Sequence, residues 1–213
     1  MRSRFWFFLL LLPLLATAGC SKLDKSSQYY YYFNNDKVYL NERRDIVFIL
    51  FEKGIPEAQK LSIVQSDATL KPWTYHARLG PDVTYDGSIG DIAVLQSSGR
   101  IHPSKINAIR NKDGVRTASY MFEKDGHFSA VDDTFTVKLN YAVEESKLEE
   151  MVRRYGCTYE PWLTDGDPWE GVYTVTVPKT SNYGTVQLSC FFQESDLFAW
   201  TSPNFYFFGA HDV

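Results

Sequence analysis

The segment from Phe135 to Phe208 switches between two hydrophobic periods, and this switching constrains the fold more than any other feature of the chain. Residues 134–139 alternate between polar and apolar side chains, which predicts a strand with one apolar face. Residues 144–155 instead place apolar side chains at helical spacing, with acidic residues early and arginines late. Gly156 follows at the position where helices commonly end. A strand is therefore followed by a helix.

The rest of this segment continues in the same way. The pattern predicts two strands joined by a turn, a second helix and a closing strand, at residues 157–163, 171–177, 183–195 and 198–208. The turn between the two strands, residues 164–168, contains Asp, Gly and Pro, which favour a chain reversal. Pro203 interrupts the closing strand, and a proline there suits the edge of a sheet or the end of a strand.

The first half of the chain repeats this order of elements with little sequence identity. It is expected to hold strand, helix, strand, strand, helix and strand at residues 45–51, 56–64, 69–77, 90–96, 102–111 and 115–123. Residues 29–40 precede them as a hairpin, because Asn34, Asn35 and Asp36 tolerate the positive φ that a tight turn requires.

Two copies of one element order predict two copies of one fold. The sequence therefore predicts an α+β protein, a tandem of two ferredoxin-like βαββαβ sandwiches preceded by an N-terminal β-hairpin. The expected domains are residues 29–130 and 131–213. Residues 81–89 are expected to form a long irregular connection, and residues 124–127 a turn near the junction between the domains.

The first 28 residues are expected to direct export and anchoring. Residues 1–19 combine two arginines, an apolar run too short to cross a bilayer and small residues at the end, which is typical of a secretory signal peptide. Thr17-Ala18-Gly19-Cys20 is similar to a bacterial lipoprotein cleavage box, so Cys20 is the candidate lipidation site and residues 20–28 the polar tether. The alternative is an ordinary cleavage site at Ala16-Thr17-Ala18.

The net charge bears on the class of partner, and the cysteines bear on whether the chain contains a disulfide. The formal net charge is −4 and no stripe of Lys and Arg is present, so nothing indicates nucleic-acid binding. Cys157 and Cys190 are expected to be buried free thiols. In an exported chain a disulfide between them is the alternative, which the sequence leaves open.

No motif in the sequence indicates an enzyme, a metal or a cofactor. The four histidines, His76, His102, His127 and His211, do not have the spacing of zinc ligands. Gly87–Asp91 has neither the spacing nor the setting of a hydrolase nucleophile elbow. The glutamate pairs at 144–145 and 149–150 fit a solvated helix face better than a glycosidase carboxylate pair.

Short motifs spread over residues 29–205 resemble those of a known family. The chain is similar to the N-terminal prosegment of subtilisin-like serine peptidases exported by Bacteroides-type bacteria, and its second half resembles their propeptide domain. The residues that carry this resemblance are Tyr29–Tyr32, Lys37–Leu40, Phe135–Leu139, Leu148, Tyr155–Cys157, Glu194–Phe198, Pro203, Asn204 and Phe205. At Asn204 the family usually has an acidic residue.

The resemblance implies a non-catalytic lipoprotein that binds a protein partner, such as a subtilisin-like protease, as an inhibitor or folding assistant. It also implies attachment through a lipid anchor to the outer membrane or cell surface of a Gram-negative bacterium. In that family the tail after the last strand enters the protease cleft, and turn carboxylates can meet helix N-termini of the enzyme. The implied partner-binding residues are Phe207, Phe208, Gly209, Ala210, His211, Asp212 and Val213, with Asp165 and Asp167.

Two alternative functions remain open at this stage. Tryptophan faces can stack on sugar rings, so the protein would bind surface glycans if Trp73, Trp162, Trp169 and Trp200 were exposed and coplanar. A structural interaction module without a protease partner is the other alternative, because Thr136, Thr174 and Thr176 make the expected outer sheet face polar.

Overall fold

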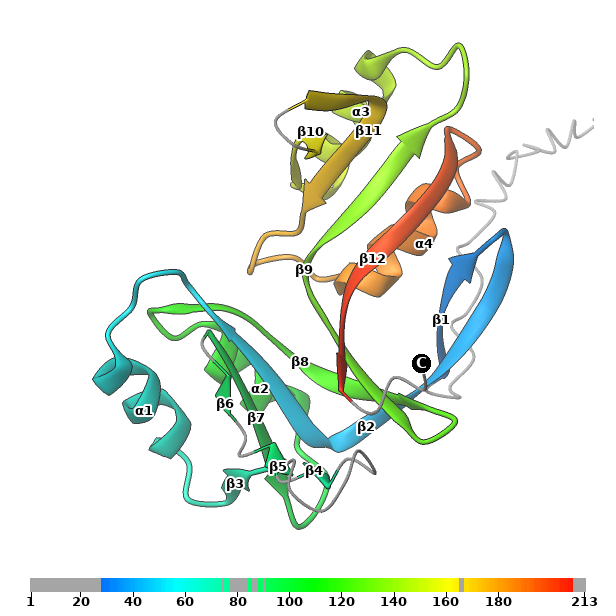
Figure 1. Cartoon of the computed structure of the whole chain (residues 1–213). Coiled ribbons are helices and arrows are strands. Elements are labelled where there is room, and N and C mark those ends of the chain that lie inside the picture. The colour runs from blue at the N-terminus through cyan, green and yellow to red at the C-terminus, as the bar shows by residue number, and fades with distance from the viewer. Residues whose placement is uncertain are drawn as a thin grey trace, which may run out of the picture.

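A computed structural model describes residues 28–73, 75–76, 84–85, 88–89, 91–164 and 167–208. Within these residues the protein is a mixed α+β chain with four helices and a largely antiparallel sheet (Figure 1). The expected signal peptide, the lipidation site Cys20, most of the tether, Asp165 and the tail 209–213 lie outside the described residues.

The chain begins with the expected hairpin. Strands β1 (Gln28–Phe33) and β2 (Asp36–Phe51) pair antiparallel across Asn34 and Asn35, whose φ angles are 51° and 65°. Two left-handed residues match the twist of the flanking strands, which confirms the turn chemistry read from the sequence. The separate strand expected at 45–51 is the second half of β2, which runs without a break for 16 residues.

The first lobe is built around the second half of β2. Its other main elements are α1 (Glu57–Gln65), β3 (Leu70–Pro72), β7 (Ile92–Ser97), α2 (Pro103–Arg110) and β8 (Val115–Lys124). The strand order is β8-β2-β7-β3, and every neighbouring pair is antiparallel. The strand expected at 69–77 is interrupted: after β3, the short strand β4 (Tyr75–His76) pairs with β5 (Thr84–Tyr85) in a separate sheet. Strands β5 and β6 (Ser88–Ile89) lie in the connection that was expected to be irregular.

One face of this sheet is covered by α1 and α2. The buried side chains between them form a cluster of Val47, Ile49, Phe51, Ile63, Leu70, Ala93, Leu95, Ile101, Ile106, Ile109, Val115 and Ala118. Helix α2 begins with Pro103 at its first position, where a missing N–H costs nothing, and His102 Nδ1 accepts a hydrogen bond from Ser104 N at 3.2 Å. The local sequence therefore fixes where α2 starts.

Strand β9 (His127–Leu139) joins the two lobes. It follows β8 across the expected tight turn, where Asp125 and Gly126 have positive φ. Its first three residues pair with β8, and residues 134–138 pair with β11 of the second lobe. The expected domain boundary between residues 130 and 131 therefore falls inside one strand, and the ten strands of the main sheet are continuous.

The second lobe has the same succession of elements. They are α3 (Glu145–Tyr155), β10 (Thr158–Thr164), β11 (Asp167–Thr176), α4 (Thr185–Gln193) and β12 (Phe198–Phe208). Strands β12, β9, β11 and β10 lie in that order, all antiparallel. Buried side chains between sheet and helices are Phe135, Val137, Leu139, Leu148, Val152, Cys157, Val175, Val177, Leu188, Phe192 and Phe198.

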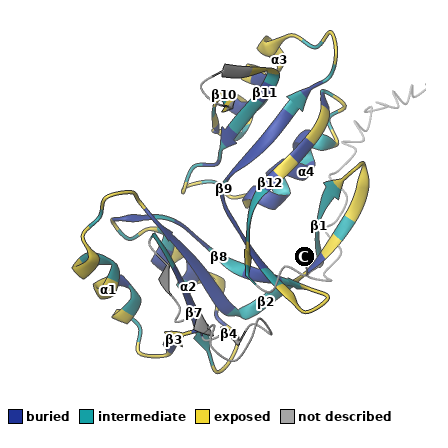
Figure 2. Ribbon diagram, in the orientation of Figure 1, coloured by how far each residue is buried: buried dark blue, intermediate teal, exposed yellow. Residues whose placement is uncertain are grey.

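The end of β12 packs against the first lobe. The Tyr206 and Phe208 rings lie 5.2 Å and 6.2 Å from the ring of Phe48 on β2, centroid to centroid. Pro203 lies in this strand at a register shift, and among the described strands β12 pairs only with β9, so the expectation of an edge position is confirmed. Figure 2 shows the buried residues concentrated along the central strands of both lobes.

Candidate functional site

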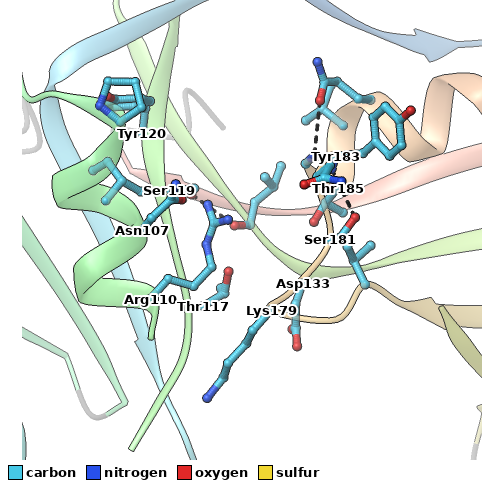
Figure 3. Close-up of a pocket in the computed structure, with 18 of the residues that line it drawn as sticks. Asn107, Arg110, Thr117, Ser119, Tyr120, Asp133, Lys179, Ser181, Tyr183 and Thr185 are labelled. Atoms are coloured by element: carbon cyan, nitrogen blue, oxygen red, sulfur yellow. Dashed lines mark hydrogen bonds between the residues drawn. The ribbon is translucent and has the colours of Figure 1, made fainter. Parts of the chain in front are cut away.

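A cleft of about 400 Å³ opens between the two lobes where β8 and β9 diverge. One wall comes from α2 and β8 of the first lobe, and the other from residues 177–187, which lead from β11 into α4. Figure 3 shows Asn107 and Arg110 on the first wall facing Ser181, Tyr183 and Thr185 on the second. Because the walls belong to different lobes, the cleft exists only in the folded arrangement of the whole chain.

Apolar side chains line part of this cleft. Ile106, Phe122, Val131 and Val186 are buried residues of the surrounding cores that also border the cavity. Tyr183 adds an exposed aromatic ring. The cleft therefore offers an apolar surface next to polar groups, which is the usual composition of a binding site.

Ion pairs tie the two sides of the cleft together. Arg116 Nε on β8 lies 2.8 Å from Asp133 Oδ1 on β9, and Lys179 Nζ of the second wall lies 2.9 Å from Glu52 Oε1 just after β2. Ser119 Oγ also donates to Val131 O at 3.4 Å. These contacts hold the lobes at their present separation.

Tyrosine and acidic groups at the cleft have shifted pKa values. Burial, followed by the neighbouring Glu42 carboxylate, raises the pKa of Tyr29 to about 12. Glu42 itself pairs with Arg44. Asp132 precedes the cleft residue Asp133 on β9. Burial raises the pKa of Asp132, although Thr134 N donates a hydrogen bond to its carboxylate at 2.7 Å. At neutral pH Tyr29 is therefore a neutral hydrogen-bonding group of the cleft.

Arg110 differs from the other arginines of the cleft. Its Nε and Nη2 donate to the Ala118 carbonyl oxygen at 3.0 Å and 2.8 Å, and burial lowers its pKa. Arg44 and Arg116 each contact a carboxylate, whereas in the described part of the chain Arg110 forms no such ion pair. Arg110 is therefore a positive charge of the cleft that no carboxylate among the described residues neutralises.

Of the residues predicted to bind a partner, the three that the structure describes, Asp167, Phe207 and Phe208, do not line this cleft. Phe207 and Phe208 belong to β12 and pair with Ser129 and Phe128, so they are not part of a free tail. Phe208 packs beside Trp73, and Phe207 is 63% exposed. Asp167 begins β11, whereas Asp165 and residues 209–213 are outside the described residues.

The tryptophans fall into different environments. Trp73 is buried against Phe128 with ring centroids 5.1 Å apart, so it belongs to the core. The ring centroids of Trp162 and Trp169 lie 4.9 Å apart on the β10–β11 hairpin, but the two rings are perpendicular. Trp169 and Trp200 are exposed. The coplanar pair that would favour sugar stacking is therefore not formed by Trp162 and Trp169.

The cysteines and histidines show no catalytic or metal-binding arrangement among the described residues. Cys157 and Cys190 are buried free thiols, so the disulfide alternative is excluded. Within the described ranges, no group of three His, Cys, Asp or Glu side chains is placed to hold a metal ion. No helix in the same residues is both long and apolar enough to cross a bilayer.

Comparisons with known proteins add no assignment to this geometry. No family model and no curated protein matched the sequence. The function must therefore be argued from the site itself.

The cleft was missed by sequence reasoning, and its key residue carried only a weak signal. Arg110 lies in the last turn of α2, where a basic residue is favoured by the helix dipole whether or not it binds a ligand. The two walls are about 70 positions apart in the sequence, so no local motif joins them. The sequence predicted two α+β units in tandem, but this prediction did not include a cleft between them.

Proposed function

We propose that this chain is a non-catalytic, exported lipoprotein that binds a protein partner, and that its two lobes are tandem ferredoxin-like units. The strand orders β8-β2-β7-β3 and β12-β9-β11-β10 support the tandem, because each places the first and third strands of its lobe at the centre. In each lobe one helix precedes and one follows the second and third strands. Cys20 is the proposed lipid attachment site.

The single observation that carries partner binding is the cleft between the lobes. It is open, it combines apolar side chains with a guanidinium that has no carboxylate partner among the described residues, and both lobes contribute to its walls. A polypeptide segment can satisfy all three features at once, since it offers apolar side chains, backbone hydrogen-bonding groups and charge.

Site-specific photo-crosslinking in the native envelope tests this proposal. A photoreactive amino acid at Asn107, which is exposed on the cleft wall, is expected to capture a protein partner on irradiation. The matched control places the same group at Leu61, an exposed residue of α1 away from the cleft. Identical adducts at both positions, or no protein adduct at Asn107, would contradict the proposed site.

A subtilisin-like serine protease is the partner class that we propose first, on the resemblance of the sequence alone. The purified chain is expected to slow hydrolysis of a chromogenic peptide by such a protease, and a variant ending at Phe208 is expected to inhibit poorly. Full inhibition by the shortened chain would exclude the tail mechanism. No inhibition by either form would exclude the protease while leaving the crosslinking result to decide on partner binding.

Glycan binding is the second candidate, and the exposed Trp169 and Trp200 favour it. Trp200 lies opposite Lys138 on the outer sheet face, which also carries Thr136 and Ser202. The rings of Trp162 and Trp169 are perpendicular, so this pair cannot present two parallel faces to a sugar. Quenching of tryptophan fluorescence by a panel of polysaccharides, lost in Trp169→Ala or Trp200→Ala, would support this function.

A further inference from the structure

We infer that the cleft between the lobes receives an acidic segment of the partner protein, and that a carboxylate of this segment binds the guanidinium of Arg110. The inference rests on the proposed function, because it specifies the chemistry of the partner at the same site. It names Arg110 as the residue that determines which segments bind.

The guanidinium of Arg110 is held in a fixed position. Two of its nitrogens donate to one carbonyl oxygen, that of Ala118 in β8, at 3.0 Å and 2.8 Å. The side chain leaves the last residue of α2 and reaches into the space between the walls, as Figure 3 shows. An arginine held by one edge retains further N–H donors for a planar acceptor such as a carboxylate.

Its charge has no carboxylate partner in the described residues, unlike the charges around it. Arg44 contacts Glu42, and Arg116 contacts Asp133 at 2.8 Å. Those arginines already have their anions, so an incoming acidic group gains little from them. A half-buried cation without a counter-ion is costly, and an anionic ligand relieves that cost.

The opposite wall of the cleft also favours a negatively charged ligand. The first turn of α4 borders the cleft at Gly184, Thr185 and Val186, and a helix N-terminus carries a partial positive charge. Lys179 on the same wall adds a further cation, although Glu52 pairs with it. Two acidic side chains line the cleft among the described residues, and each already has a cation: Glu42 pairs with Arg44, and Asp133 pairs with Arg116. The cleft is thus complementary to a negative ligand.

The occupant is a peptide segment and not a free small acid, because apolar residues on both walls border the cavity in addition to the charge of Arg110. Ile106 and Val186 lie on opposite walls and both border the cavity. A segment with one acidic and one or two apolar side chains can contact these residues and Arg110 together. A small carboxylate would reach Arg110 alone.

Selection from a random octapeptide display library tests the inference with the purified chain and with Arg110→Met. The wild-type chain is expected to enrich peptides with Asp or Glu at one fixed position flanked by apolar residues. Arg110→Met, which keeps the length of the stem but removes the charge, is expected to lose the acidic preference. For the best wild-type peptide we expect binding to fall about tenfold or more in Arg110→Met, as for the loss of one charge-assisted pair.

Controls separate this result from a folding defect. Arg110→Lys should retain part of the affinity, and Arg153→Met, at an exposed arginine of α3, should retain all of it. Thermal unfolding of each variant shows whether it is folded. For the bound peptide, amide chemical shifts of β8 and α2 should change, because these elements form the first wall.

Several outcomes would overturn the inference. They are equal binding of the acidic peptide and its Asn or Gln counterpart, unchanged selection on Arg110→Met, or binding of free acetate with no peptide selected. A partner crosslinked at Asn107 but no acidic preference would overturn the inference and leave the proposed function intact. An acidic preference without any crosslinked protein would instead remove the proposed protein partner.

Discussion

Burial decides the chemistry of the two cysteines that the structure describes. It raises the pKa of Cys157 to about 11 and that of Cys190 to about 12, so both are protonated thiols at neutral pH. The Cys190 Sγ also lies 3.1 Å from the carbonyl oxygen of Tyr30. In the folded chain we expect neither thiol to react with iodoacetamide at pH 8, and both to react in urea, as measured by mass spectrometry of tryptic peptides.

A cysteine placed on the surface provides the control for this prediction. Ser98 is exposed after β7, so Ser98→Cys should be alkylated rapidly in the folded chain. If Cys190 reacted at the rate of this added cysteine, the contact between Cys190 of α4 and Tyr30 of β1 would be contradicted.

Asp67 gives one region of the protein a pH-dependent stability. Lys105 Nζ lies 2.6 Å from its carboxylate and Thr69 donates two hydrogen bonds to it, which together lower the pKa of Asp67 to about 2. A lowered pKa means that the folded state prefers the charged form, so the stabilisation is present above about pH 4 and lost as the pH falls toward 2.

We therefore expect Asp67→Asn to destabilise the protein at neutral pH and to matter less in acid. The loss should be about 1 kcal/mol at most, because the pair is open to solvent. Urea unfolding at several pH values between 7 and 3 measures it. Thr69→Val, which removes only the hydroxyl donor, should show a smaller effect. A stability difference between the wild type and Asp67→Asn that stays constant with pH would contradict the assignment.

At the level of the elements, helix α3 ends where a glycine allows it to end. Gly156 has a φ of 69°, and its N–H bonds the carbonyl oxygens of Val152 and Arg153. We expect Gly156→Ala to lower the free energy of unfolding by about 1 kcal/mol, because a Cβ is disfavoured at this φ. The open space around Gly156 means that no steric clash adds to this value.

A second glycine separates the effect of φ from that of side-chain size. Gly99 also has open space around it but does not have a left-handed φ, so Gly99→Ala should leave stability nearly unchanged. Chemical denaturation of both variants gives the comparison. Equal losses at the two positions would show that backbone conformation is not the cause.

Elements with a local signal could be predicted from the sequence, and those that depend on distant pairing could not. The ends of α3 and the turn at Asn34 and Asn35 were found because the deciding residues are neighbours in the chain. The full length of β2 was missed because polar residues 41–44 interrupt its apolar pattern. In the structure these residues remain in the strand, since Arg43 pairs with Glu123 of the adjacent β8.

The candidate site follows the same rule. Its walls come from α2 and from residues 177–187, and only the divergence of β8 from β9 brings them face to face. The sequence pattern placed Phe207 and Phe208 in the closing strand, which is confirmed, and only the family resemblance implied that they belong to a free tail. Their pairing with β9 is a long-range contact that no local pattern contains.

At the scale of the whole molecule, the two lobes share both a strand and a core. Strand β9 pairs with β8 at one end and with β11 at the other, so it joins the strands of both lobes into one sheet. Tyr206 and Phe208 of β12 complete a cluster whose buried members include Ile46, Phe48, Leu50, Trp73, Val94, Met121 and Ala130. Loss of one lobe therefore exposes apolar surface of the other.

This coupling predicts that the protein unfolds in one cooperative step although its sequence suggests two domains. Phe48 in the first lobe and Phe192 in the second are both fully buried, so Phe48→Ala and Phe192→Ala should each cost about 3–5 kcal/mol. Each variant should lower the denaturant midpoint of unfolding. This midpoint should be the same when hydrogen exchange is followed in peptides of either lobe. If Phe192→Ala instead released α3 and α4 to exchange while β2 and β7 stayed protected, the lobes would be independent domains. The cleft between them would then be free to open, because the Arg116–Asp133 and Lys179–Glu52 pairs alone would hold its walls together.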